Sequence, residues 1–174
     1  MKLLIALVAF ASLAVGQSAP EPDIADIFYR LEGERLVQLE RQGAATQTGA
    51  HGFIVMTMKS SAEFPGGKSP VRFKAGEPLT FIVRSAIPIG SIDPNTIYHL
   101  RRLVAKKKTR ELVTMSGNAN PFGVSTKING TTGLLPVEFS KYGDHSLRAV
   151  TESLPPGEYA FSKLGGAAFC FGVD

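Results

Sequence analysis

Few residues in this chain have the types and spacing that hydrolytic chemistry requires. Asp144, His145 and Ser146 supply the residue types of a catalytic triad, but consecutive residues of a strand project to opposite faces and cannot converge on one atom. Gly143, just before them, favours a polar turn with an exposed imidazole. There is also no Gly-x-Ser-x-Gly motif. No catalytic residue is therefore predicted and a non-catalytic protein is preferred, although an enzyme with a site drawn from distant loops stays an alternative.

Metal and cofactor sites are not indicated either. Zinc sites take several His or Cys ligands at short spacings, whereas the other two histidines, His51 and His99, and the single cysteine, Cys170, are far apart. Asp93 and Asn95 are calcium-ligand types, but they flank a proline and lack the further acidic residue of a calcium loop, so a capped turn is expected. A phosphate-binding loop needs glycines between a strand and the start of a helix. The glycines here lie between expected strands, so no such loop is expected. We expect no metal and no cofactor.

A basic cluster is the strongest surface signal. Six cations occur within ten residues, and a hairpin would gather them at one projecting end. The simplest interpretation is a solvated turn whose lysines discourage edge-to-edge pairing. The functional interpretation is a docking site for an anionic envelope component or another exported protein. Nucleic acid is not expected, because no aromatic residue lies within the cluster to stack on bases. The candidate anion-binding residues are Arg101, Arg102, Lys106, Lys107, Lys108 and Arg110.

The first sixteen residues have the pattern of a secretory signal peptide. Lys2 precedes an apolar run, and the small residues Ala14 and Gly16 suit a cleavage site after residue 16. This predicts a secreted or periplasmic protein, and no second apolar run follows that would give the mature chain a transmembrane segment. Residues 17–26, rich in proline and acidic side chains, predict an extended lead-in before a single domain at 27–174.

Short strands between turn-forming residues account for the rest of the chain. The 18 glycines and 11 prolines suit an all-β protein with short strands and long loops. A hairpin is favoured over a helix near residue 30, because Gly33 interrupts the helical stripe. Many strands at this spacing predict an antiparallel β-sandwich or a barrel. Strands are expected at 27–31, 36–39, 53–59, 79–84, 97–104, 110–115, 137–139, 147–149 and 167–173, and loops at 42–52, 60–70, 87–95 and 116–123.

The only cysteine lies within the last expected strand. A single cysteine excludes an internal disulfide, so packing alone must hold the core. The two-residue period of a strand places Phe169, Phe171 and Val173 on one face and Cys170 on the other. We expect Cys170 to be a small buried apolar residue, with an intermolecular disulfide as the alternative.

Residues 154–161, with the sequence LPPGEYAF, carry the one family resemblance in the chain. This pattern resembles the entry to the penultimate strand of immunoglobulin-like and fibronectin type III-like domains. The resemblance implies an immunoglobulin-like sandwich in which Tyr159 is the tyrosine corner, its hydroxyl bonded to backbone just upstream. Gly157 would permit the tight entry into the strand. The paired cysteines and core tryptophan of antibody domains are absent.

Two further expectations concern this end of the chain. Along the strand after Gly157, Tyr159 and Phe161 should face the core, while Glu158 and Ser162 should face water. The ending at 169–174 is similar to the close of uncharacterised bacterial exported domains, a likeness that implies no activity.

The function that these features favour is an exported, non-catalytic binding or accessory module. A structural subunit that assembles through an edge strand is a second alternative. Asn129, followed by Gly130 and Thr131, fits a glycosylation site, but Asn-Gly is also the strongest two-residue hairpin turn, which is preferred.

Overall fold

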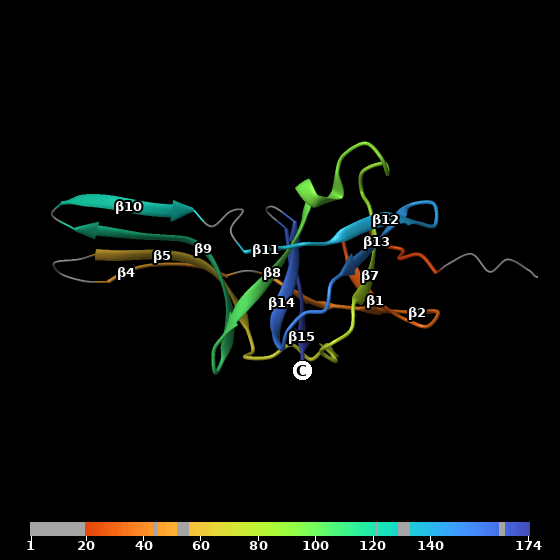
Figure 1. Ribbon diagram of the computed structural model, residues 1–174, viewed down its shortest axis with the longest axis horizontal. Helices are drawn as coiled ribbons and strands as arrows, with labels where there is room; N and C mark the ends of the chain where they lie inside the picture. Colours follow the sequence, from red (N-terminus) through yellow and green to blue (C-terminus); the bar gives the residue numbers. More distant parts are fainter. Residues whose placement is uncertain (1–19, 44, 52–55, 121, 129–132, 164–165) are drawn as a thin grey trace, which may run out of the picture.

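The computed structural model describes residues 20–43, 45–51, 56–120, 122–128, 133–163 and 166–174. Within those ranges the chain is nearly all β, with one short 3-10 helix, η1 (Pro94–Thr96) (Figure 1). No helix in the described ranges is long and apolar enough to cross a membrane. The strands are β1 (Phe28–Glu32), β2 (Arg35–Gln38), β3 (Glu40–Gln42), β4 (Ala45–His51), β5 (Met56–Pro65), β6 (Arg72–Phe73), β7 (Leu79–Arg84), β8 (Tyr98–Ala105), β9 (Thr109–Asn120), β10 (Gly123–Ile128), β11 (Leu134–Leu135), β12 (Glu138–Tyr142), β13 (Ser146–Thr151), β14 (Gly157–Lys163) and β15 (Ala168–Val173).

The smaller sheet has five strands in the order β12-β13-β7-β1-β2, all antiparallel. Its first hairpin confirms the hairpin prediction, because Glu32 pairs with Arg35 and leaves only two residues in the turn. Gly33 is the first of these and has a φ of +59°, a conformation that glycine adopts without strain. Glycine at this point ends any helix and turns the chain back on itself.

The larger sheet has the order β3-β15-β14-β8-β9-β5-β4. Three short or outer strands join it, with β10 on β9, β11 on β8 and β6 on β15. The β6 pairing is parallel, whereas the other ladders of this sheet are antiparallel. The predicted pairing of the strands on either side of the lysine-rich turn is confirmed, since Val104 lies opposite Glu111.

One apolar core joins the two sheets. The ring of Phe28 stacks on that of Phe161 with centroids 4.1 Å apart, and the rings of Phe81 and Phe171 are 5.0 Å apart. In each pair one ring comes from the smaller sheet and the other from the larger. Such ring pairs contribute about 0.5–1.5 kcal/mol beyond the area they bury. Phe169, Phe171 and Val173, predicted to share one face of the last strand, are in this core, together with apolar residues of the strands predicted at 79–84, 137–139 and 147–149.

The opposite face of the larger sheet has a second, smaller apolar cluster. It contains Cys170 together with Phe64, Leu103, Ala160 and Ala168. The cysteine is completely buried, as predicted, and burial raises the pKa of its thiol to about 12. A thiol that stays protonated and inaccessible is a packing residue and not a nucleophile.

The corner that the family resemblance implied is present. The side chain of Tyr159 is 1% exposed, and its hydroxyl donates a hydrogen bond of 2.6 Å to the carbonyl of Pro155. The expectation for Glu158 was wrong, because this side chain is buried and forms an ion pair with Arg72. The face of β14 expected to meet water is instead covered by the loop between β5 and β6, whose Ser69 amide also donates to the Glu158 carboxylate.

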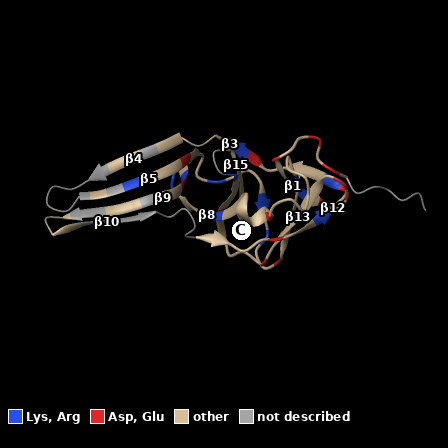
Figure 2. Ribbon diagram, turned by 90° about the horizontal axis from the view of Figure 1, so that it is seen from above, with Lys and Arg blue, Asp and Glu red and all other residues tan. Residues whose placement is uncertain are grey.

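Strands β4, β5, β9 and β10 extend away from the rest of the molecule, and we call them the arm (Figures 1 and 2). Their order in the arm is β4-β5-β9-β10. The ladder between β5 and β9 has a register shift between Ser60 and Ser61, which is typical of a β-bulge.

The arm corrects three loop predictions. Residues 42–52 contain β4, residues 60–70 contain the end of β5, and β9 continues through 116–120. These segments are rich in small polar residues, which suggested loops, but pairing with neighbouring strands satisfies their backbone groups whatever the side chains. Of the strand expected at 53–59, residues 53–55 lie outside the described residues and the remainder belongs to β5.

Candidate anion-binding site

The six cations of the predicted cluster do not share one surface. Arg110 is completely buried and forms a bidentate ion pair with Glu40, with Nη1–Oε2 and Nη2–Oε1 distances of 2.6 and 2.8 Å. Its guanidinium also donates to the carbonyls of Pro65 and Gly66. A buried arginine with its donors occupied in this way holds the fold together and cannot meet an external anion.

Two more cations of the cluster are not free surface charges, because Arg101 is buried and Lys106, although exposed, is paired with a carboxylate. Arg101 is 8% exposed within the larger sheet. Lys106 lies 2.9 Å from one carboxylate oxygen of Glu111, and Lys59 lies 2.8 Å from the other. Burial raises the pKa of Glu111, but the hydrogen bonds from Lys59, Ser61 and Lys106 outweigh it and lower the value to about 2. The charge of Lys106 is therefore balanced by a permanent carboxylate.

Arg102, Lys107 and Lys108 keep exposed side chains, and Lys68 joins them from a distant part of the sequence. Gly67 packs so closely on the turn between β8 and β9 that an added Cβ would lie 2.6 Å from the carbonyl oxygen of Lys106 and 2.9 Å from that of Lys107. We call Lys68, Arg102, Lys107 and Lys108 the basic tip. None of these four forms an ion pair with a carboxylate within the described part of the chain.

A second contact holds the loop in place, because the Gly66 amide donates a 2.9 Å hydrogen bond to the carbonyl of Lys108. Sequence reasoning missed Lys68, which is remote from the cluster in sequence. The only signal for it is the pair of glycines just before it, which permits the close approach of two backbones. The turn lies at the same end of the molecule as the C-terminus (Figure 1).

An open groove of about 560 Å³ lies beside the basic tip. Lys68 and Lys107 line one part, and Pro156 and Gly157 line another. The guanidinium of Arg102 donates to the Pro156 carbonyl at 2.8 Å, and this bond holds the arginine at the edge of the groove.

Arg72 also lines the groove, and its charge is already neutralised. It forms ion pairs with Glu158 and Asp174, and the hydrogen bonds that it donates, first to Asp174 and then to Glu158, raise the pKa of the arginine above its ordinary value. The same bond lowers the pKa of Asp174. Of the described cations at this groove, those of the basic tip are therefore the ones that form no ion pair with a carboxylate.

The residues considered for catalysis do not converge. Glu21 accepts hydrogen bonds from the amides of Asp144 and His145 and from the hydroxyl of Ser146, at 2.6, 2.9 and 2.6 Å. The imidazole of His145 is exposed, so the polar-turn interpretation is confirmed. The Asp93 carboxylate accepts the Asn95 amide at 2.9 Å, which confirms the capped turn.

The other two histidines, His51 and His99, belong to β4 and β8, on strands separated by β5 and β9. No group of three metal-ligating side chains is present in the described residues. Asn129 and the predicted leader at 1–16 lie outside the described residues.

No protein family model, no curated protein and no solved structure matches this chain.

Proposed function

We propose that the protein is an exported, non-catalytic binding module that holds an anionic component of the cell envelope at the basic tip. The observation that carries the proposal is the contrast within the cluster. Arg110 and Lys106 of the cluster and the nearby Arg72 are paired with carboxylates, whereas Lys68, Arg102, Lys107 and Lys108 form no ion pair among the described residues. Export is inferred from the predicted leader at 1–16.

The open shape of the groove favours a polymer over a small anion. Exposed lysines bind phosphate as point charges, and each contact is weak when fully hydrated. Several such contacts along one chain of phosphates add up, and counterion release makes the binding strongly salt-dependent. A phosphate-bearing envelope polymer has this chemistry.

We further infer that the body of the protein is an immunoglobulin-like sandwich. In the smaller sheet, the neighbouring strands β1-β7-β13-β12 correspond to strands A-B-E-D of that fold. In the larger sheet, the neighbouring strands β8-β14-β15 correspond to strands C-F-G. Tyr159 lies at the start of β14, which is strand F in this scheme. The turn between β8 and β9 then lies at the same end of the sandwich as the corner at Pro155, and this explains why both border the groove.

A polyphosphate surface tests the proposal directly. The variant Lys107→Gln/Lys108→Gln should bind immobilised polyphosphate at least roughly tenfold more weakly than the unmodified protein at low salt. The matched control is Arg35→Gln/Lys141→Gln, which removes two exposed charges from β2 and β12 at the two edges of the smaller sheet. Equal weakening by both variants would show that only net charge matters, and absence of binding by the unmodified protein would refute the proposal.

Assembly through an edge strand is the second candidate function, and the arm favours it. Each of its outer strands pairs on one side only within the described residues, β4 with β5 and β10 with β9. Strand β4 contains neither proline nor a charged Lys, Arg, Asp or Glu residue, which are the usual protections of an edge. Sedimentation over a wide range of protein concentrations distinguishes the candidates, because a monomer throughout excludes self-assembly.

A further inference from the structure

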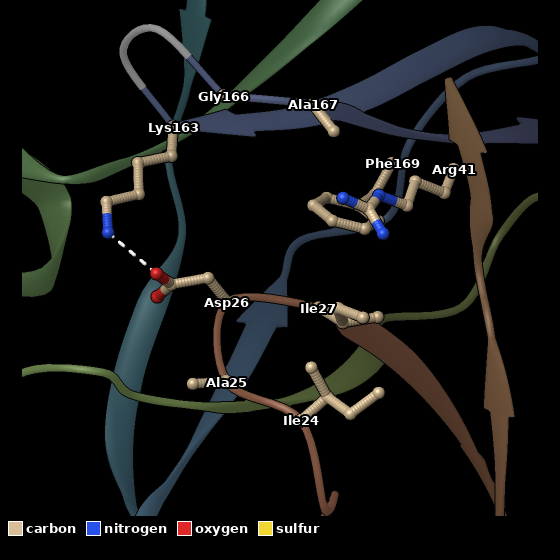
Figure 3. A pocket seen from close by; sticks show the side chains of 9 residues that line it. All are labelled: Ile24, Ala25, Asp26, Ile27, Arg41, Lys163, Gly166, Ala167 and Phe169. Atoms are coloured by element: carbon tan, nitrogen blue, oxygen red, sulfur yellow. Dashed lines mark hydrogen bonds and ion pairs between the residues drawn. The ribbon is translucent and has the colours of Figure 1, made fainter. Parts of the chain in front are cut away.

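A second pocket, of about 350 Å³, lies between residues 24–27 and the strands β3, β14 and β15. Figure 3 shows that charged side chains lie at two sides of it, with Asp26 and Lys163 on one and Arg41 on the other. Apolar side chains, among them Ile24, lie between these charges. The pocket is independent of the basic tip and shares no lining residue with the groove described above.

The Asp26 side of the pocket is rigidly held. Asp26 has a φ of +59° and is the only non-glycine residue with a positive φ in the described part of the chain. Its carboxylate accepts hydrogen bonds from the Tyr98 hydroxyl at 2.6 Å and from the Lys163 ammonium at 2.7 Å, and its amide donates to the Arg84 carbonyl at 2.8 Å. Strained backbone of this kind persists only where the surroundings fix it, and it is concentrated at binding sites.

The charges on the Asp26 side of the pocket are paired with each other within the protein. Burial acts to raise the pKa of Asp26, but the hydrogen bonds from Lys163 and Tyr98 outweigh it and lower the value. The carboxylate and the lysine thus neutralise each other. A ligand meets a fixed polar wall there and gains no net charge attraction.

The opposite side carries the uncompensated charge. Arg41 lies on the outer strand β3, directly opposite Phe169 on β15, and both residues line the pocket. The Arg41 side chain is exposed, and no carboxylate pairs with it among the described residues. With Asp26 and Lys163 balanced, the pocket has a net charge of one positive unit, located at Arg41.

An exposed apolar side chain completes the pocket. Ile24 is 59% exposed, one of the few large apolar residues on the described surface, whereas Ile27 and Phe169 form a buried floor. A guanidinium beside an apolar floor fits a molecule with a carboxylate at one end and hydrocarbon behind it.

We propose that this pocket binds a small organic acid with one carboxylate and an apolar body of about eight carbons, a size suited to the lower end of the usual range of ligand cavities. The carboxylate pairs with Arg41, and the hydrocarbon lies against Phe169 and covers Ile24. The binding free energy comes from the charge of Arg41 and from apolar contact. Uncharged and cationic molecules of the same length lack the charge attraction and therefore bind more weakly.

The test is a titration of the mature chain with octanoate, followed by heteronuclear NMR. Octanoate should shift the amide signals of Ala25, Gly166 and Ala167, which line the pocket. Octan-1-ol and octylammonium should cause clearly smaller shifts at the same concentration. Equal shifts with octan-1-ol, or octanoate shifts located elsewhere, would overturn the proposal.

Two matched pairs of variants assign the contacts. Arg41→Gln should weaken octanoate binding roughly tenfold, whereas Arg35→Gln, which removes an exposed arginine from β2, should leave it unchanged. Ile24→Ser should weaken binding several-fold, whereas Ile92→Ser, at a position that is 50% exposed, should not. The four spectra also report folding. If the two variants of a pair weaken octanoate binding equally, the contact assigned to Arg41 or to Ile24 in that pair is contradicted.

Discussion

The packing of Gly67 on the β8–β9 turn links the fold to the basic tip, and Gly67→Ala tests that link. The added Cβ would lie 2.6 and 2.9 Å from two backbone carbonyl oxygens, distances that real Cβ atoms essentially never show. Since backbone and not a flexible side chain is in the way, the loop that carries Lys68 must move off the turn. Overpacking of this kind costs about 1–3 kcal/mol.

That cost corresponds to a decrease in Tm of roughly 3–8 °C for a chain of this size. Denaturant unfolding and thermal unfolding measure the loss of stability, and polyphosphate binding should fall with it because Lys68 leaves Lys107. Gly43→Ala is the control, because nothing lies within 4 Å of its added Cβ and its φ is ordinary. If Gly67→Ala is as stable as Gly43→Ala and binds polyphosphate normally, the reasoning is wrong.

Three further predictions concern the core and the ion pairs. Tyr159→Phe should lower the free energy of unfolding by about 1 kcal/mol in urea titrations, because the bond to the Pro155 carbonyl is lost, and an unchanged value would contradict the corner. The pKa of Glu111 is about 2, against an ordinary 4.5, so its ionised carboxylate stabilises the fold by up to ~3 kcal/mol above pH 4.5. This stabilisation is lost as the pH falls towards 2 and the carboxylate is protonated. In Glu111→Gln, the free energy of unfolding should therefore fall less steeply between pH 4.5 and pH 2 than in the unmodified protein. Glu34→Gln, at the exposed β1–β2 turn, should leave this pH dependence unchanged. A thiol reagent at pH 8 should label Cys170 only after denaturant is added, and fast labelling of the native protein would show that the thiol is not buried.

Several strands of the body could be predicted because apolar residues recur along them with the two-residue period of a strand. Leu79, Phe81 and Val83 recur at this period along β7 and pack in the core, and Phe169, Phe171 and Val173 do the same along the last strand. A turn residue with a special backbone requirement, such as Gly33, fixed the hairpin in the same way. Local patterning therefore sufficed wherever apolar residues followed the period of a strand.

The arm and the groove could not be predicted, since both depend on contacts between distant segments. The alternation rule failed at Glu158, because the face expected to meet water is covered by a loop some ninety residues earlier in the chain, where Ser69 donates to it. The surface cluster prediction failed for Arg110 for a similar reason, since its carboxylate partner, Glu40, comes from an outer strand that is distant in sequence. Charge clustering in sequence is thus a weak guide to charge on the surface when a cation can find a buried carboxylate.

If an anionic polymer docks at the basic tip, short-chain polyphosphate should shift the amide signals of that surface when it is added to the protein. The largest shifts should occur at Gly67, Lys68, Lys107 and Gly157, and they should diminish as the salt concentration is raised. Shifts that are concentrated on the arm, or that persist at high salt, would contradict docking at the basic tip.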